Sequence, residues 1–93
     1  MGFEWDDKKA TSNLKKHGVS FSEAATVFSD DNAMEMLDMD HSNEYEDRWI
    51  LLGVSSRSNI LIVVFLEKTD EEIRIISARK ATKNESEQYF RMR

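Results

Sequence analysis

Apolar side chains between positions 21 and 28 recur every three to four residues, which is the spacing of one face of a helix. The segment opens with Ser20-Phe21-Ser22-Glu23, a capping box in which two polar side chains satisfy free backbone amides. We therefore predict a helix to about Phe28, with one apolar face in the core. That face consists of Phe21, Ala24, Ala25 and Phe28.

A more polar helix is predicted before it, over about residues 8–16. Asp6 or Asp7 can cap its first amides. Gly18 is placed to end it, because glycine adopts the left-handed conformation at little cost. The preceding residues, Phe3-Glu4-Trp5, are predicted to form a short extended segment.

Two apolar segments in the middle of the chain, residues 49–54 and 60–66, have hydrophobic side chains at both alternating positions. This pattern is typical of strands that are covered on both faces. The segment between them, Ser56-Arg57-Ser58-Asn59, has the composition of a turn, so the two strands are predicted to form a hairpin.

Further strands are predicted on both sides of this hairpin, over residues 33–37 and 73–78. Thr82-Lys83-Asn84-Glu85 is a second capping box, which opens a helix to the end of the chain. The order is two helices, three or four antiparallel strands and one helix. We therefore predict a small α+β domain spanning residues 1–93.

The composition excludes several classes of protein. The 93 residues contain no cysteine, which excludes disulfides, thiolate catalysis and cysteine-based metal sites. The longest apolar run, residues 60–66, is far shorter than the roughly 20 residues that span a bilayer. The amino end is acidic, unlike a signal peptide, so we expect a soluble cytoplasmic protein.

The net charge of −5 argues against a general nucleic-acid-binding protein, but the charges are unevenly distributed. Six basic and two acidic residues lie in residues 73–93, and a second basic cluster lies in residues 8–16. Such a distribution can form a local positive surface on an acidic protein. An acidic block consists of Asp30, Asp31, Glu35, Asp38, Asp40, Glu44, Glu46 and Asp47.

Neither a metal nor a nucleotide cofactor is expected from the sequence. His17 and His41 are the only histidines and lie 24 positions apart. Asp38-x-Asp40-x-Ser42 begins like a calcium loop, but Asn43 and Trp49 stand where such a loop has glycine and glutamate. The three glycines are isolated, and no Gly-x-Ser-x-Gly elbow of a serine hydrolase is present.

The strongest candidate for a functional site is the basic segment Arg74-Ile75-Ile76-Ser77-Ala78-Arg79-Lys80. The guanidinium of arginine binds phosphate oxygens through its planar fork and stays charged at any working pH. On a regular strand Arg74 and Lys80 share one face and Arg79 lies on the other. Both arginines can serve one site only if the strand bulges or ends near Ser77. The alternative explanation is that these charges keep an exposed edge strand soluble.

Other polar positions also have two explanations. The first predicted helix has a polar stripe of Lys9, Asn13 and Lys16, and His17 at its end either covers the last carbonyls or belongs to a site. Glu85 and Tyr89 lie one helical turn apart, as a structural pair or a functional one.

Several of these segments, taken together, resemble the BrnT family of ribonuclease toxins. The likeness begins with Phe3-Glu4-Trp5-Asp6-x-x-Lys9 and Asn13-Leu14-x-Lys16-His17-Gly18-Val19-Ser20-Phe21-x-Glu23-Ala24. It continues with Glu46-x-Arg48 and ends with Ile73-Arg74-Ile75-Ile76-Ser77-Ala78-Arg79-Lys80-Ala81-Thr82-x-x-Glu85 and Tyr89. It therefore covers almost the whole chain.

The resemblance implies a RelE-like fold, in which helices pack beside a twisted antiparallel sheet. It also implies a type II toxin that cleaves messenger RNA, inhibits translation and arrests growth. The implied partner is a BrnA-type antitoxin with a ribbon-helix-helix domain, through which DNA would be contacted only indirectly. A 2:2 complex with that antitoxin is one stoichiometry that this allows, and neither a membrane partner nor a cofactor is expected.

For this activity we predict metal-independent attack of a ribose 2′-hydroxyl on the adjacent phosphorus, which needs a base, stabilising cations and an acid. Arg48 could also orient the base, since it lies two residues away from it on the expected strand face. The candidate site residues are Glu46 as base, Arg74, Arg79 and Lys80 as stabilising cations, His17 or Tyr89 as acid, and Lys9, Lys16 and Arg48 as RNA contacts.

The acidic block would repel RNA, so we expect it to face solvent or basic residues of the antitoxin. The alternative function is a catalytically inactive toxin-like domain that binds its antitoxin and acts only in transcriptional autoregulation. The net charge of −5 favours this alternative.

Overall fold

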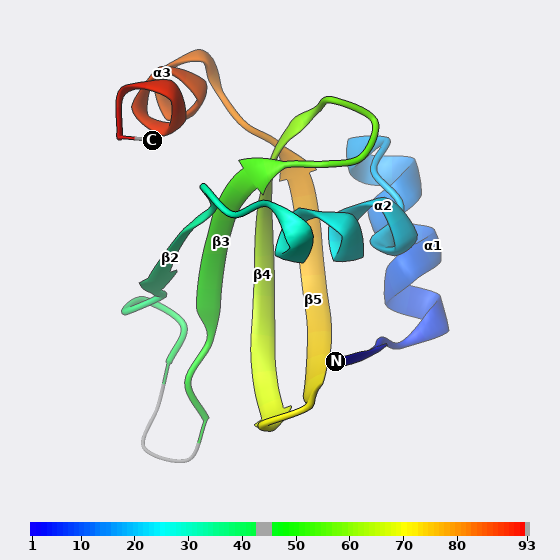
Figure 1. Ribbon diagram of the computed structural model, residues 1–93. Helices are drawn as coiled ribbons and strands as arrows, with labels where there is room; N and C mark the ends of the chain where they lie inside the picture. The colour runs from blue at the N-terminus through cyan, green and yellow to red at the C-terminus, as the bar shows by residue number, and fades with distance from the viewer. Residues whose placement is uncertain (43–45, 93) are drawn as a thin grey trace.

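A computed structural model describes residues 1–42 and 46–92. Within these ranges it contains helices on both sides of a five-stranded sheet (Figure 1). The helices are α1 (Asp7–His17), α2 (Phe21–Thr26), the short 3-10 helix η1 (Val27–Ser29) and α3 (Lys83–Met92). The strands are β1 (Gly2–Glu4), β2 (Met34–Leu37), β3 (Trp49–Val54), β4 (Ile60–Thr69) and β5 (Glu72–Lys80).

The strand order is β1-β5-β4-β3-β2, with the predicted β3–β4 hairpin at the centre. The α+β class is confirmed, and so is the expectation of up to four antiparallel strands, which are β2 to β5. β1 adds a fifth strand that runs parallel to β5, with Phe3 beside Ile73. A strand of three residues is too short to show an alternating pattern, so the sequence indicated only an extended segment there.

The predicted helix boundaries are confirmed by their caps. The Asp6 carboxylate accepts hydrogen bonds from two amides of the first turn of α1, and Gly18 ends that helix with φ 69°. The Ser20 and Thr82 hydroxyls each accept from the amide three residues on, at 3.0 and 3.2 Å. Each bond satisfies an amide that has no partner within the helix.

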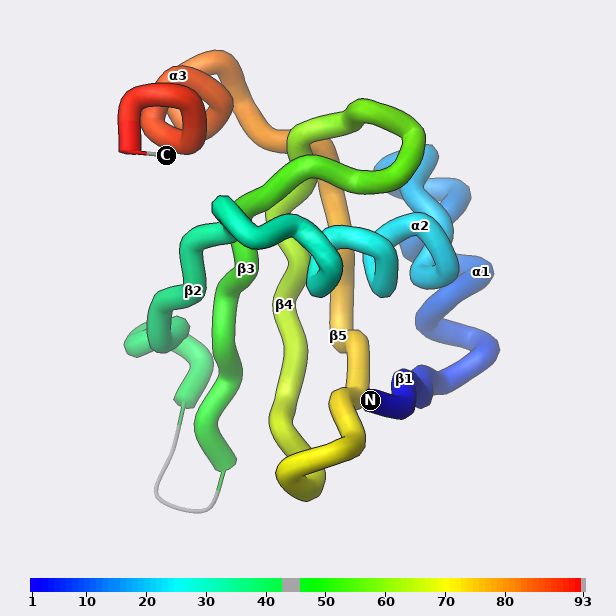
Figure 2. The backbone as a smooth tube through the Cα atoms, viewed as in Figure 1, coloured from blue at the N-terminus to red at the C-terminus, as the bar shows by residue number. Residues whose placement is uncertain are grey.

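The sheet has apolar side chains on both faces, and different helices cover them. The larger cluster includes Phe21, Leu51 and Phe65 and lies between the sheet and α2. The smaller cluster joins Leu52 and Ile62 to Tyr89 of α3 on the other face. Figure 2 shows that α3 lies beyond one end of β3, so it covers only that end of its face. No helix among the described residues is long and apolar enough to cross a membrane.

A bulge in β5 changes which residues share a face. Ile75 pairs with Phe65 and Ser77 with Val64, so Ile76 is the extra residue on β5. Ile73, Ile75 and Ala78 all belong to the core cluster under α2. Arg74 and Arg79 therefore point to the opposite face, and the bulge near Ser77 that a shared arginine site requires is present.

A side chain of α1 closes the edge of β5 that β1 does not reach. Asn13 Nδ2 donates to the carbonyl oxygens of Ala78 and Val19 at 2.8 and 2.9 Å, and the Ala78 amide donates to Asn13 Oδ1 at 3.1 Å. The buried amide of Asn13 thus occupies the place of a neighbouring strand and fixes α1 against β5.

Candidate functional site

The part of the sheet face opposite α2 that α3 leaves uncovered is the candidate site, and we call it the open face. Arg74 and Arg79 project onto it from β5, and Leu66 of β4 lies beside Arg74. Arg79 pairs with Ile62, four residues before Leu66 on β4, so the Cα atoms of the two arginines are about 13 Å apart. This separation suits two positions along an extended ligand better than one phosphate.

Arg74 is held by a carboxylate from the neighbouring strand β1. Its Nη1 donates to Glu4 Oε2 at 2.7 Å, and Lys68 Nζ lies 3.5 Å from Glu4 Oε1. A hydrogen bond with Glu72, followed by those with Arg74 and Lys68, lowers the pKa of Glu4 despite the opposing effect of desolvation. The same contact raises the pKa of Glu72. Two cations and two carboxyl groups therefore share this end of the open face.

Arg79 is held by Glu85 in the first turn of α3. Its two terminal nitrogens donate to the two Glu85 oxygens at 2.7 and 2.9 Å, a bidentate pair. These hydrogen bonds lower the pKa of Glu85 to about 2 and raise the pKa of Arg79. Glu85 also accepts from the Thr82 amide at 2.8 Å, which completes the predicted capping box. The pair joins α3 to β5 and leaves Arg79 partly exposed.

Lys80, predicted to assist the arginines, lies on the wrong face for that role. The bulge places Ala78 and Lys80 on the α2 side, opposite Arg79. On that side, burial raises the pKa of Glu23 in α2, but hydrogen bonds from Asn59 and Ser55 and the charges of Arg57 and Lys80 lower it overall. The regular alternation assumed from the sequence fails because of the bulge.

The predicted base Glu46 and its neighbour Arg48 lie in the loop before β3 rather than on the strand. Arg48 Nε is 3.6 Å from Glu46 Oε1, so their predicted contact is present as an ion pair. The structure gives Glu46, Arg74 and Arg79 three different partners and does not bring them into direct contact. A cavity of about 470 Å³ beside Glu46 is lined by Glu46, Asp47, Trp49, Leu66, Glu67 and Lys68.

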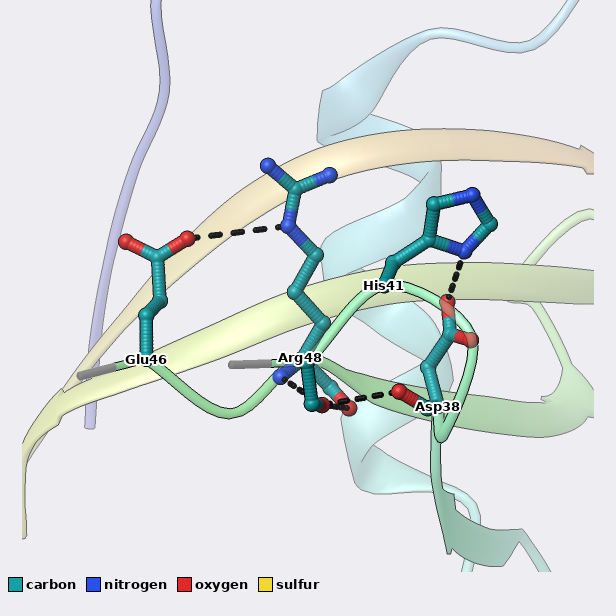
Figure 3. Close-up of polar contacts among 5 residues, drawn as sticks. Asp38, His41, Glu46 and Arg48 are labelled. Carbon is teal, nitrogen blue, oxygen red and sulfur yellow. Dashed lines mark hydrogen bonds and ion pairs between the residues drawn. The ribbon is translucent and has the colours of Figure 1, made fainter. Parts of the chain in front are cut away.

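The same loop contains a pair that sequence reasoning missed. Asp38 Oδ2 lies 3.0 Å from Nδ1 of His41, with only 11% of the Asp38 side chain exposed and 65% of the His41 side chain. Figure 3 shows the Arg48 side chain rising between Glu46 and His41. The signal in the sequence is the spacing Asp38-x-x-His41 in a polar segment, which also begins like a calcium loop.

Hydrogen bonds to the backbone hold this loop in place. Ser42 Oγ donates to the Asp38 carbonyl at 2.7 Å and accepts from the Arg48 amide at 3.0 Å, and the Asp38 amide donates to the Arg48 carbonyl at 2.7 Å. The Asp38 side chain is thus bonded to His41, and the Ser42 side chain is bonded to the loop backbone. Among the described residues no group of three potential metal ligands is found.

The predicted contacts on α1 lie along the edge of β5. Lys9 and Lys16 share a helical stripe with Asn13, which faces that edge, and both lysines are exposed. His17 ends α1, and its side chain makes no hydrogen bond or ion pair with the described part of the chain. In Figure 1, α1 ends near the opposite end of the sheet from the start of β3, which Glu46 precedes. His17 and Glu46 therefore do not share a site.

Tyr89, the second predicted acid, is structural in this fold. It is 1% exposed, and its hydroxyl donates to Asp30 Oδ2 at 2.6 Å. Asp30 Oδ2 also accepts from the Val54 amide at 3.0 Å, so this contact ties α3 to the end of β3. A hydroxyl that is buried and hydrogen-bonded in this way is not accessible to an RNA leaving group, which disfavours Tyr89 as the acid.

A family profile described as the ribonuclease toxin BrnT of type II toxin–antitoxin systems matches residues 5–85. The chain belongs to the BrnT family of ribonuclease toxins. The resemblance seen in the sequence is confirmed. BrnT-family membership identifies the protein as a ribonuclease toxin of a type II system, which makes an antitoxin its expected kind of partner.

A solved BrnT structure has the same fold. The crystal structure of the Brucella abortus ribonuclease toxin BrnT matches with a TM-score of 0.67 and 24% identity. The match covers 89% of this chain and 99% of that one, so the α+β fold class is confirmed over nearly the whole domain. No sequence among the curated proteins matches the chain.

Proposed function

We propose that this BrnT-family protein is a metal-independent endoribonuclease that cleaves messenger RNA and thereby inhibits translation. The observation that carries the proposal is the β5 bulge, which turns Arg74 and Arg79 to one open face of a ribonuclease-toxin fold. Guanidinium groups bind phosphate oxygens and stabilise the crowded phosphorus of the transition state. Their separation of about 13 Å suits adjacent parts of one RNA strand.

The remaining roles follow from where the side chains lie. Glu46 is exposed and paired with Arg48 only at 3.6 Å, so its carboxylate is accessible as the base for a 2′-hydroxyl. Lys9 and Lys16 extend along the edge of β5 and would hold flanking phosphates without reading sequence. Lys80 lies on the other sheet face and has no role in this proposal.

The direct test is incubation of the purified protein with messenger RNA in the presence of EDTA. We expect fragments with 2′,3′-cyclic phosphate and 5′-hydroxyl ends, because the attacking group is the neighbouring ribose hydroxyl. Expression without the antitoxin should arrest bacterial growth, and coexpression should restore it. RNA that stays intact at every protein concentration and no arrest of growth would contradict the proposal.

A specific observation favours the second candidate, a catalytically inactive domain that binds its antitoxin and acts only in transcriptional autoregulation. Each arginine of the open face already has a carboxylate partner, Glu4 for Arg74 and Glu85 for Arg79. RNA must compete with these partners, and the net charge of −5 opposes its approach. Intact RNA together with tight antitoxin binding would support this candidate.

The proposed partner is a BrnA-type antitoxin with a ribbon-helix-helix domain, and DNA would be reached only through it. The exposed carboxylates of the acidic block, such as Asp31 and Asp40, are suited to basic residues of that partner. Binding there would leave the arginines of β5 for a separate contact with the antitoxin or with RNA.

A further inference from the structure

We propose that His41, oriented by Asp38, is the general acid of this ribonuclease and acts across Arg48 from Glu46, the base. The inference rests on the proposed ribonuclease function and deepens it by assigning the proton donor. The three groups come from two described segments that precede β3, residues 38–42 and 46–48, and Figure 3 shows Arg48 between the other two. All three precede β3, so their positions do not follow from the alternation of side chains along a strand.

The geometry of the His41–Asp38 pair suits proton transfer. Asp38 Oδ2 accepts from Nδ1 at 3.0 Å, so the ring presents its other nitrogen, Nε2, to the surroundings. The Asp38 carboxylate is nearly buried while the ring is 65% exposed, so one partner is fixed and the other is accessible. A carboxylate that fixes the orientation of an imidazole in this way is a recurring arrangement in acid–base catalysis.

The loop backbone holds this pair relative to Arg48. The Ser42 hydroxyl joins the Asp38 carbonyl to the Arg48 amide, and the amide of Asp38 donates to the Arg48 carbonyl. These bonds connect residues ten positions apart in the chain, so the ends of the loop move together. Such backbone support is what a catalytic group on a loop needs.

The Arg48 guanidinium would face the phosphate and lie between Glu46, which accepts a proton, and His41, which donates one. The Glu46 carboxylate removes the 2′-hydroxyl proton, the bond from O2′ to phosphorus forms, and the bond from phosphorus to O5′ breaks. The proton on His41 Nε2 passes to O5′ as it leaves. The products are a 2′,3′-cyclic phosphate and a 5′-hydroxyl, and exchange of protons with water resets Glu46 and His41.

Neither alternative proton donor has this geometry. The Tyr89 hydroxyl is buried and bonded to Asp30. His17 lies at the end of α1, and its ring has no carboxylate partner among the described residues. Arg74 stands across Leu66 from the loop, on the open face, and would hold a neighbouring phosphate of the same strand.

The decisive experiment compares His41→Gln with Met39→Gln, an exposed neighbour in the same loop. With an all-oxygen RNA substrate in EDTA, His41→Gln should lower kcat by about 100-fold or more and leave KM nearly unchanged, while Met39→Gln behaves as wild type. A substrate with sulfur in place of the scissile 5′-oxygen needs no proton on its leaving group. His41→Gln should cleave that substrate at close to the wild-type rate, whereas Glu46→Gln should not.

Asp38 is tested as a positioning residue by Asp38→Asn, with Asp70→Asn in the β4–β5 turn as the control. Asp38→Asn should lower kcat on the oxygen substrate by about tenfold or more, with full recovery on the sulfur substrate. A purely structural role would instead lower both rates together.

The outcomes separate this inference from the proposed function. If wild type cleaves RNA in EDTA and His41→Gln cleaves it equally well, the acid is another group and the inference is wrong while the function stands. If His41→Gln is equally slow on both substrates, His41 is not the acid. If wild type leaves RNA intact, both the ribonuclease function and the assignment of His41 as its acid are contradicted.

Discussion

The open face of β5 and the loop before β3 position their charged side chains in opposite ways. On β5, Arg74 and Arg79 are each held by a carboxylate of another element, Glu4 of β1 and Glu85 of α3. In the loop, the nearly buried Asp38 holds an exposed ring, and hydrogen bonds of the Ser42 hydroxyl join the backbone of Asp38 to that of Arg48. The strand therefore presents neutralised pairs, while the loop presents an oriented and accessible group.

This difference suggests a division of labour on one sheet face. Ion pairs that are partly exposed contribute little to stability and can exchange partners, so RNA phosphates can replace Glu4 and Glu85 at modest cost. Proton transfer needs a fixed orientation, which the loop supplies. The arginines would then act mainly in binding and charge stabilisation, and the loop in proton transfer.

The largest expected effect comes from removing the arginines of β5. Arg79→Ala and Arg74→Ala should each lower the rate of RNA cleavage by about 100-fold, because each removes a stabilising cation. The melting temperature should fall by only a few degrees, because each partly exposed pair contributes about 1 kcal/mol or less. Gel assays of RNA cleavage and thermal unfolding measure the two effects. Arg57→Ala, in the exposed β3–β4 turn, is the control. Equal cleavage by either variant would remove that arginine from the site and leave the loop as the centre of the chemistry.

A smaller effect is expected when the backbone support of the loop is removed. Ser42→Ala deletes the hydroxyl that joins Asp38 to Arg48, so kcat should fall about tenfold while the affinity for RNA changes little. Stability should fall by about 1 kcal/mol, measured by urea unfolding. Ser56→Ala, exposed in a turn, should change neither quantity. A variant with full activity would show that the loop is positioned by other contacts.

The stability of α3 against acid distinguishes the two regions in another way. Glu85 has a pKa of about 2 in the folded protein, below the usual value of 4.5, because Arg79 and Thr82 bond to its charged form. Its contribution is fully present above about pH 4.5 and is lost as the pH falls toward 2. Glu85→Gln should therefore cost about 1 kcal/mol at pH 7 after solvent screening, and the cost should shrink at low pH.

Thermal unfolding between pH 7 and pH 3 measures this dependence. Glu87→Gln, exposed on the same helix, is the matched control and should leave the dependence on pH unchanged. A cost of Glu85→Gln that is the same at both pH values would show that the Arg79–Glu85 pair does not stabilise α3.

The elements that the sequence predicted correctly depend on neighbouring residues. The capping residues Ser20 and Thr82 and the glycine at position 18 mark helix boundaries through contacts only three or four residues long. The β3–β4 hairpin follows from two apolar runs and a turn. Because such signals involve only neighbouring residues, they can be recognised in a single sequence without the structure.

The features that the sequence could not predict depend on residues far apart. The parallel pairing of β1 joins Phe3 to Ile73, and the bulge at Ile76 decides which face Arg79 and Lys80 occupy. The alternation of residues 73–80 gave the wrong face for Lys80, because one extra residue inverts every side chain after it. The sequence did not reveal the His41–Asp38 pair for a related reason: Asp38 is held through its amide by the carbonyl of Arg48, ten positions away in the chain.

The smallest effect is expected from the acidic block, which tests whether the loop region also faces the antitoxin. Reversing two exposed carboxylates, Asp31→Lys with Asp40→Lys, should weaken antitoxin binding about fivefold and reduce its dependence on salt, since each exposed pair is worth about 0.5 kcal/mol. Asp70→Lys, a reversal outside the block, is the control for the general change of charge. Calorimetry at two salt concentrations measures both quantities. If affinity and salt dependence both stay at the values of the control, the antitoxin binds elsewhere, and the arginines of β5 become its more plausible contact.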